Sequence, residues 1–396
     1  MKSFFICEIC GNQNKNKIGI RNGEYYCRAC IEFCGQKAPR VNYQPLDLNI
    51  KIDYELTPAQ KDISQSVLQN FKSKKDTLIY AVCGAGKTEL IFEVIKYALK
   101  KGKQVGFTIP RREVVIEIAN RLKSTFPRAK VISVFGDQTK TLTGNIIVLT
   151  THQLFRYPNY FDLLIFDEID AFPYAGDLVL EAMFKKSIRG NFVILTATPS
   201  KKLLAKFQAT NSVLTLFSRF HNKNIPVPRF IAGYGVLNIV YLFQSLRDFI
   251  LRKKPVLIFV PTIREAEFIF KIIGKIFING NIVHSKKENK TEIIRQFKER
   301  EYDYLVTTTV LERGVTIVGL QVIVFGADSA IYDAASLIQI AGRVGRKKEE
   351  SDGEVIFIGT KKTTSIEEAI ADIEEKNSYL QNVYGERSKN ESLQSK

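Results

Sequence analysis

The chain has 396 residues, enough for two or three domains that each bury a core of their own. Hydrophobic residues make up 45% and charged residues 25%, an average globular profile that excludes a disordered or fibrous protein. Lys and Arg number 58 against 41 Asp and Glu, a formal net charge of +17. A polyanion is the expected partner: nucleic acid, or by the same physics an anionic membrane surface.

Membrane-spanning and secretion signals are not expected in this sequence. No stretch approaches the roughly eighteen consecutive apolar residues that span a bilayer, and the apolar run near Phe4 is too short for a signal peptide. We therefore expect a cytoplasmic protein.

The first predicted element is a small cysteine-rich module over residues 1–40. Five of the six cysteines lie in the first 34 residues, and two Cys-x-x-Cys pairs are separated by sixteen residues. This spacing matches a four-thiolate zinc site, and a bound zinc would fold a module too small to hold itself together. The expected ligands are Cys7, Cys10, Cys27 and Cys30. Cys34 is expected to be a free thiol, with a ligand role in place of Cys30 as the alternative.

After a linker over 41–56, the pattern changes to alternating strand-like and helix-like blocks. A helix is expected over 88–100, with Gly102 as its stop. Apolar segments between helix-like blocks indicate βα units around a buried parallel sheet, and we place this first domain at 57–222. The predicted strands are 77–82, 104–109, 130–135, 145–150, 162–166 and 192–196.

A second α/β domain is predicted over 230–380. The prolines in 224–229 indicate a linker before it, because proline removes a backbone donor and disfavours helix in the preceding residue. Helices are expected over 262–277 and 287–300, and the polar segment 381–396 is expected to be a disordered tail. The predicted strands are 256–260, 282–284, 304–308, 322–325 and 354–358.

In the first domain, a phosphate-binding loop follows the predicted strand 77–82 and opens the helix expected over 88–100. Its glycines allow backbone donors to approach phosphate oxygens, Lys87 is expected to reach the β and γ phosphates of ATP, and the Thr88 hydroxyl is expected to ligate Mg²⁺. The first glycine of the general pattern is Ala81 here, so the strict motif is not met. The predicted ATP-binding residues of this segment are Gly84, Ala85, Gly86, Lys87, Thr88 and Glu89.

An acidic motif, Asp167-Glu168-Ile169-Asp170, ends another apolar strand about eighty residues later. We expect Asp167 to hold Mg²⁺ and Glu168 to polarise the attacking water. Downstream, Thr196-Ala197-Thr198-Pro199 ends a further strand, where hydroxyl groups can bond these carboxylates. An ordinary strand-to-turn junction is the alternative for that segment.

The second domain carries the segment Gln339-Ile340-Ala341-Gly342-Arg343-Val344-Gly345-Arg346. Two arginines three residues apart share one face of a helix, from which they can reach a γ phosphate. Arginine fingers of this kind contribute about 10³–10⁵ in rate. We therefore predict catalytic roles for Gln339, Arg343 and Arg346, with a solvated basic helix end as the alternative.

Taken in order, the motifs resemble those of superfamily 2 helicases and translocases over residues 54–360. The resemblance implies an α/β fold of two tandem RecA-like, P-loop NTPase domains, here preceded by the zinc module. It also implies that Gln60 reads adenine and that Gly314 lies in the ATP site. The residues that it places on the nucleic-acid backbone are Arg111, Thr151, His152, Thr262 and Thr308.

Departures from the RNA-unwinding DEAD-box branch favour DNA as the substrate. Ile169 stands where that branch has alanine, and Thr309 and Thr316 stand where it usually has aspartates. The Leu-Thr-x-x-Gln form of the upstream glutamine motif is closer to DNA translocases of the RecG and PriA kind.

A narrower resemblance is to the ComFA family of bacterial competence ATPases. It rests on the amino-terminal four-cysteine module together with 167–174 and 311–316. It implies an ATP hydrolase stimulated by single-stranded DNA, with ATP, Mg²⁺ and Zn²⁺ as cofactors. It further implies work at the cytoplasmic face of the membrane, where incoming DNA is drawn through the ComEC channel with ComFC as a companion.

Two other readings stay open at this stage. One is a PriA-like replication-restart helicase, although PriA has a large DNA-binding region before its motor and its cysteines within the motor. The other is a zinc-dependent adaptor that only binds nucleotide. The complete set of phosphate-loop lysine, acidic pair and paired arginines argues against the adaptor, because a scaffold that does not hydrolyse ATP needs no such set.

Overall fold

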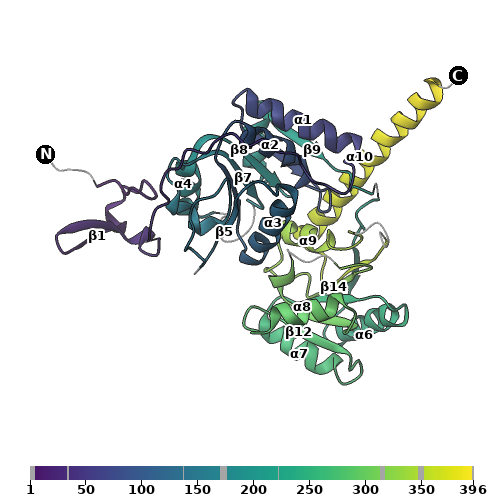
Figure 1. Ribbon diagram of the computed structural model, residues 1–396. Helices are drawn as coiled ribbons and strands as arrows, with labels where there is room; N and C mark the ends of the chain where they lie inside the picture. Colours follow the sequence, from purple (N-terminus) through teal and green to yellow (C-terminus); the bar gives the residue numbers. More distant parts are fainter. Residues whose placement is uncertain are drawn as a thin grey trace. The chain divides into compact units, whose positions relative to one another are not determined.

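The computed structural model describes residues 5–33, 35–136, 138–169, 176–221, 223–312, 317–346 and 352–394, with side chains described up to residue 379. The chain divides into two compact units (Figure 1). The first comprises Met1–Ala81 and Gly86–Leu216, and the second comprises Val82–Ala85 and Phe217–Lys396. In the described part of the chain, no helix is both long and apolar enough to cross a membrane.

The amino-terminal module is a short antiparallel hairpin flanked by 3₁₀ turns. Its elements are η1 (Lys15–Lys17), β1 (Ile18–Arg21), β2 (Glu24–Cys27) and η2 (Arg28–Cys30). Asn22 and Gly23 join the strands with φ of 51° and 83°. Two consecutive positive φ angles are what a type I′ hairpin turn requires, and Asn-Gly is its preferred sequence.

The first unit is built around a seven-stranded sheet whose pairings are all parallel, in the order β5-β6-β4-β7-β8-β3-β9. Its strands are β3 (Thr77–Ala81), β4 (Val105–Ile109), β5 (Val131–Val134), β6 (Ile146–Thr150), β7 (Phe161–Asp167), β8 (Ile188–Thr196) and β9 (Val213–Leu216). Its helices are α1 (Pro58–Lys72), η3 (Glu89–Ile91), α2 (Phe92–Lys100), α3 (Arg112–Thr125), η4 (Thr151–Arg156), α4 (Leu178–Ser187) and α5 (Lys201–Gln208).

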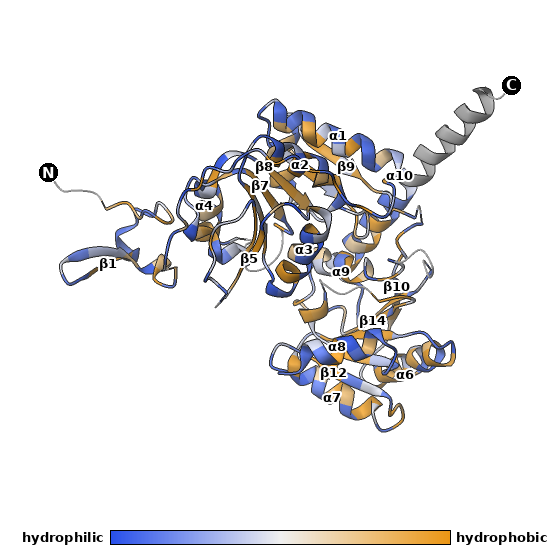
Figure 2. Cartoon of the chain, viewed as in Figure 1, coloured by the Kyte–Doolittle hydropathy of each residue, from blue (hydrophilic) through white to orange (hydrophobic). Residues whose placement is uncertain are grey.

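This arrangement confirms the predicted α/β class and explains the continuous apolar strands. Every residue of β4 and β6 is buried, as expected where helices cover both faces of a parallel sheet. Figure 2 shows apolar strands β7 and β8 inside and a helix α1 that alternates polar and apolar residues outside. The predicted helix over 88–100 begins as the 3₁₀ turn η3 before α2. The edge strand β9 is absent from our prediction.

The second unit contains a six-stranded, all-parallel sheet in the order β10-β15-β14-β11-β13-β12. Its strands are β10 (Arg229–Ala232), β11 (Val256–Phe259), β12 (Gly280–Val283), β13 (Tyr304–Thr307), β14 (Gln321–Phe325) and β15 (Val355–Gly359). Its helices are α6 (Val236–Leu251), α7 (Ile263–Ile273), α8 (Lys290–Lys298), η5 (Thr309–Leu311), α9 (Ala334–Ala341) and α10 (Thr364–Gln394).

Three boundaries differ from those we predicted. The residues from Phe217 group with the second unit, whereas we placed the end of the first domain at 222. β10 begins at Arg229, the last residue of the predicted linker. α10 continues to Gln394, across most of the tail predicted to be disordered, in a segment rich in the helix formers Glu, Lys, Gln and Arg.

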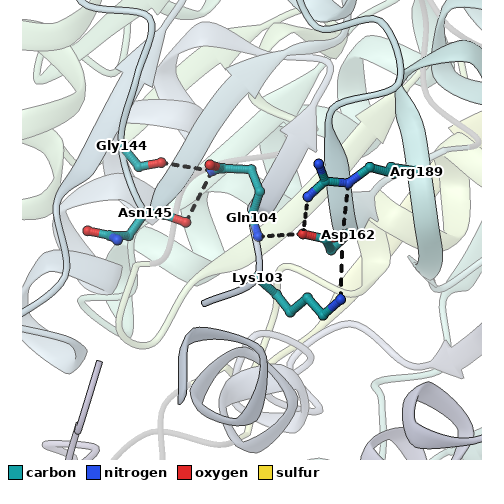
Figure 3. A network of polar contacts seen from close by, with 6 residues as sticks. All are labelled: Lys103, Gln104, Gly144, Asn145, Asp162 and Arg189. Carbon is teal, nitrogen blue, oxygen red and sulfur yellow. Dashed lines mark hydrogen bonds and ion pairs between the residues drawn. The ribbon is translucent and has the colours of Figure 1, made fainter. Parts of the chain in front are cut away.

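A buried carboxylate holds the amino-terminal edge of the first sheet together (Figure 3). Asp162 at the start of β7 accepts hydrogen bonds from the backbone N–H of Gln104 at 2.8 Å and from Arg189 Nε at 3.0 Å. Gln104 Nε2 in turn donates to the carbonyls that precede β6, those of Gly144 and Asn145. One polar network therefore joins β6, β4, β7 and β8 at this edge.

Candidate active site

The opposite, carboxyl-terminal edge of the first sheet brings the nucleotide motifs together. β3, β8 and β7 are neighbours, and they end at Ala81, Thr196 and Asp167. The register pairs Tyr80 with Thr196 and Asp167 with Leu195, so the three strands end at nearly the same level. Ligands of parallel α/β sheets bind at this edge, which makes it the candidate active site.

The phosphate loop leaves β3 with the backbone that a phosphate cradle needs. Gly84 and Gly86 have φ of 83° and 77°, a region that residues with a Cβ rarely adopt. Lys87 Nζ donates to the carbonyl of Ala81 at 3.4 Å, and Thr88 is buried at the start of the following turn. The Lys87 ammonium group therefore lies at the start of the loop that is expected to bind the phosphates of ATP.

Gln60 lies against this loop from helix α1. Its side-chain oxygen accepts from the backbone N–H of Thr57 at 2.9 Å, while Thr57 Oγ1 accepts from the backbone N–H of Gln60, a capping box that begins α1. A Cβ added to Gly86 would lie only 2.7 Å from Gln60 Nε2. Helix capping thus fixes the carboxamide beside the phosphate loop, and its contact with adenine remains a prediction.

Glu89, predicted to bind ATP, is buried in a network of protein contacts. Its Oε1 accepts from Tyr54 OH at 2.8 Å and forms an ion pair with Arg121 of α3. These contacts favour a structural role, in which Glu89 ties the end of the phosphate loop to α3 and to the linker preceding α1.

The acidic pair lies at the end of β7. Asp167 is the last residue of the strand, and the backbone N–H of Glu168 donates to the carbonyl of Leu195 at 3.0 Å. Glu168 has φ of 61°, in the left-handed region that a non-glycine residue occupies at a cost of about 1–3 kcal/mol. Strain of this kind gathers at functional sites, as expected for a carboxylate that must point at a substrate. Asp170 lies outside the described residues.

The strands that carry the predicted nucleic-acid contacts of the first unit continue the same edge. β4 lies between β7 and β6, and Ile109 pairs with Thr150. Arg111, partly exposed, is the N-cap of α3, whereas the Thr151 side chain is fully buried at the start of η4. The nucleotide motifs and the predicted nucleic-acid contacts therefore occupy adjacent halves of one edge.

His152, also predicted to contact nucleic acid, packs against the cysteine module. Its ring stacks on Phe33 with centroids 5.9 Å apart, and Phe33 also contacts Phe155 of η4. Burial lowers the pKa of His152 below its ordinary value, because desolvation disfavours the charged imidazolium.

The four predicted zinc ligands converge. The sulfur atoms of Cys7, Cys10, Cys27 and Cys30 all lie within 4.8 Å of one another, and those of Cys10 and Cys27 are 3.8 Å apart. Tetrahedral zinc with Zn–S bonds of about 2.3 Å requires sulfurs roughly 3.8 Å apart. The donor set therefore fits Zn²⁺. Cys34 lies outside the described residues.

The cysteine module is attached to the first unit through its own backbone. Lys186 Nζ of α4 donates to the carbonyls of Glu8 at 2.6 Å and Cys7 at 3.3 Å. Arg156 Nη1 of η4 donates to the carbonyl of Gln36 at 2.8 Å. The module thus contacts η4, the element that carries Thr151 and His152.

In the second unit, the predicted nucleic-acid residues also follow neighbouring strands. β11 and β13 are paired, with Phe259 opposite Thr307. Thr262 is exposed and is the N-cap of α7, where it forms a capping box with Glu265, and Thr308 is buried directly after β13. Both residues lie at the carboxyl-terminal edge of the second sheet.

The arginine motif departs from our expectation of a shared helical face. α9 ends at Ala341, so Arg343 and Arg346 lie in the turn beyond it. Arg343 is 2% exposed and its Nε donates to the carbonyl of Glu312 at 2.7 Å, whereas Arg346 is partly exposed with Nε donating to Gly342. Gln339 is buried on α9. Gly314 and its neighbours at 313–316 lie outside the described residues.

Sequence reasoning missed one residue beside this turn. Arg219 is 1% exposed and donates to backbone carbonyls of the turn, although it is a single arginine in a polar connector. Burial, together with the nearby Arg346, lowers the pKa of Arg219 to about 10. No motif marks this arginine in the sequence.

Two tandem parallel sheets with a phosphate loop and an acidic strand end define a superfamily 2 helicase-type ATPase. Residues 53–201 match the family model for the type III restriction enzyme res subunit, and residues 241–348 match that for the helicase conserved C-terminal domain. The fold is shared with the Mycobacterium smegmatis helicase Lhr bound to ssDNA and AMP-PNP, with a TM-score of 0.61 and 17% identity. That match covers 82% of this chain and 48% of Lhr.

Curated relatives identify the family. The chain is 33% identical to competence protein ComFA of Bacillus subtilis, over 95% of this chain and 86% of the relative. It is 32% identical to ComFA of Streptococcus pneumoniae, over 94% and 90%. The chain belongs to the ComFA family. It is an ATP-hydrolysing enzyme of the helicase superfamily that binds nucleic acid, which confirms the predicted fold, class and resemblance.

Proposed function

We propose that this protein is an ATP-driven translocase on single-stranded DNA that powers the uptake of transforming DNA across the cytoplasmic membrane during natural competence. The observation that carries the proposal is the carboxyl-terminal edge of the first sheet. There the strands of the nucleotide motifs, β3, β8 and β7, lie next to β4 and β6, whose ends carry the predicted nucleic-acid contacts. Movement on DNA requires this proximity, because ATP turnover must alter the grip on the phosphates.

The residues at this edge have distinct chemical roles in the proposal. Lys87 neutralises the β and γ phosphates of ATP, and Glu168 accepts a proton from the attacking water. Thr88 and Asp167 would hold Mg²⁺, which supplies charge neutralisation on the phosphates when bound. Of the two arginines, the partly exposed Arg346 is the better candidate to stabilise transition-state charge.

The cysteine module is proposed to bind one structural zinc ion. Four thiolates complete a tetrahedral shell and leave no position open for a substrate, which is the property of a structural site. Its contacts with α4 and η4 suit it to support the neighbouring nucleic-acid segment.

The proposed partners follow from family membership and charge. Single-stranded DNA fits the net charge of +17, and ComEC and ComFC are the channel and companion that the family implies. We propose that the protein works as a peripheral component at the inner face of the cell membrane.

ATPase rates with no nucleic acid, single-stranded DNA, duplex DNA and RNA test the substrate. We expect the largest stimulation by single-stranded DNA, together with ATP-dependent displacement of streptavidin from a biotinylated oligonucleotide, since a moving motor pushes the obstacle off. Stimulation by RNA alone would reject the DNA assignment. Absence of ATP turnover under all four conditions would favour the nucleotide-binding adaptor. Efficient unwinding of forked duplexes would favour a restart helicase.

A further inference from the structure

Arg219 is a fully buried cation held by backbone carbonyls. It lies in the connector that follows β9 and belongs to the second unit. Its Nη1 donates to the carbonyls of Val344 at 2.7 Å and Gly345 at 2.9 Å, and its Nη2 donates to that of Gly342 at 3.4 Å. A guanidinium with 1% exposure needs such acceptors, because burial of an unsatisfied charge is costly.

The acceptors make this a specific site. They lie in the turn 342–346, which begins at Gly342, the C-cap of α9. Carbonyls at and beyond a helix end have no intrahelical donor, and the helix end carries partial negative charge. A planar guanidinium presents several N–H groups in a fixed fork and can therefore serve all three carbonyls at once. A lysine ammonium cannot reproduce that arrangement.

His221 holds the same turn from the same connector. Its Nε2 lies 2.8 Å from the carbonyl of Gly345, and its Nδ1 accepts from the backbone N–H of Lys223 at 3.2 Å. An Nδ1 that accepts leaves the proton of a neutral imidazole on Nε2, which therefore donates to Gly345. Two connector side chains thus grip one turn.

The carbonyl of Gly342 links this grip to Arg346. It accepts from Arg219 Nη2 and, at 3.0 Å, from Arg346 Nε. The backbone that Arg219 orients is therefore the backbone that orients the guanidinium of Arg346.

The connector is itself fixed on helix α10. The backbone N–H of Ile225 donates to Asn377 Oδ1 at 3.0 Å, and Asn377 Nδ2 donates back to the Ile225 carbonyl at 2.9 Å. The ring of Phe217 packs edge-on against Tyr379, with centroids 5.3 Å apart. Arg219 and His221 therefore lie between two anchored points.

We propose that Arg219, assisted by His221, is a positioning residue that sets the conformation of the turn 342–346 and thereby aims the Arg346 guanidinium for ATP hydrolysis. The inference rests on the catalytic role proposed above for Arg346. It assigns to the connector between the two RecA-like domains a direct part in preparing the arginine motif.

A double-mutant cycle on the full-length protein measures this coupling. Arg219→Ala is expected to lower kcat of the DNA-stimulated ATPase by about 10- to 100-fold, because small misplacements of a catalytic group are that costly. ATP affinity, measured by equilibrium binding of a fluorescent analogue, should change less than about two-fold. In the Arg346→Ala background, Arg219→Ala should cause no further loss, whereas multiplied losses would overturn the proposal.

Hydrogen–deuterium exchange provides a readout that does not depend on catalysis. The peptide containing 342–346 should exchange faster in Arg219→Ala, and to a smaller degree in His221→Ala, than in the wild type. Unchanged exchange would refute the positioning role even if ATPase activity fell. Wild-type ATPase in Arg346→Ala would instead reject the catalytic role of Arg346, while exchange still decides whether Arg219 orders the turn.

Two controls separate positioning from general destabilisation. Arg252→Ala removes an exposed, ion-paired arginine of the same unit and should leave both ATPase and exchange at 342–346 unchanged. Arg219→Lys keeps the charge without the fork and should recover only part of kcat, at a melting temperature close to that of the wild type. Recovery of full activity by lysine would contradict the fork geometry on which the proposal depends.

Discussion

At the residue scale, Glu168 has a strained backbone and directly follows Asp167, the last residue of β7. Its left-handed φ persists in a strand end otherwise held by regular parallel pairing with β8. Strain retained at one carboxylate beside a phosphate loop is consistent with selection for chemistry over stability.

Glu168→Gln removes the proposed proton acceptor while it keeps the size of the side chain. We expect kcat for ATP to fall by at least about 100-fold, with ATP binding nearly unchanged, because general base catalysis contributes about 10²–10⁴ in rate. Steady-state ATPase and equilibrium ATP binding measure the two quantities. Glu117→Gln, at an exposed position of α3, is the matched control, and normal turnover by Glu168→Gln would remove Glu168 from the mechanism.

Substitution of Asp162 tests how much its polar network stabilises the amino-terminal edge of the first sheet. Asp162→Asn leaves the exposed Arg189 without its carboxylate and should lower the free energy of unfolding by about 2–3 kcal/mol, less than for a fully buried pair because solvent screens the arginine. Denaturant titration measures the loss, and ATPase per folded molecule should be unchanged. Glu181→Gln, which breaks an exposed pair with Lys185, should cost less than about 0.5 kcal/mol.

At the element scale, the proposed zinc ion would stabilise the cysteine module, because the hairpin of the module is short. Within the described module, the buried hydrophobic side chains are Cys7, Cys27 and Cys30, so little apolar surface supports the fold without a bound ion. Lys186 and Arg156 donate to backbone carbonyls of the module, so these hydrogen bonds depend on the module keeping its conformation.

Replacement of Cys27 and Cys30 by Ser should release close to one zinc ion per chain. Two ligands are lost, and a tetrahedral site does not survive that change. Elemental analysis measures the metal, and limited proteolysis should show cleavage within residues 5–33 while the rest of the first unit stays resistant. Unchanged zinc content would overturn the assignment. The single variant Cys83→Ser, which removes a thiol outside the cysteine module, serves as the control.

At the scale of the whole molecule, the net charge of +17 predicts binding to single strands that weakens steeply with salt. Each phosphate contact contributes a slope of about 0.7 in log K against log salt concentration. Arg111→Ala should therefore reduce the slope by about 0.7, whereas Lys185→Ala, on the exposed face of α4, should leave it unchanged. Fluorescence anisotropy over a salt series measures both, and an unaltered slope for Arg111→Ala would remove that contact.

Much of the fold and of the ATP site could be predicted from local patterns. The phosphate loop, the acidic motif and the paired cysteines are short segments whose spacing along the chain reflects their geometry, and the apolar runs between them predicted most strands. Edge strands β9 and β10 were missed because they are four residues long and only partly buried, so their pairing with β3 and β15 carries little signal in the sequence.

The sequence by itself determined the family, and it predicted the nucleotide motifs and the four cysteines whose sulfur atoms the structure brings together. Only the tertiary structure showed that Arg343 is buried while Arg346 is partly exposed. Only the tertiary structure showed that Arg219, in a polar connector, contacts the turn 342–346. The physical reason is that burial and carbonyl acceptors depend on segments far apart in the chain: Arg343 donates to Glu312, 31 residues away, and Arg219 donates to Gly345, 126 residues away. Local sequence patterns contain no record of such neighbours.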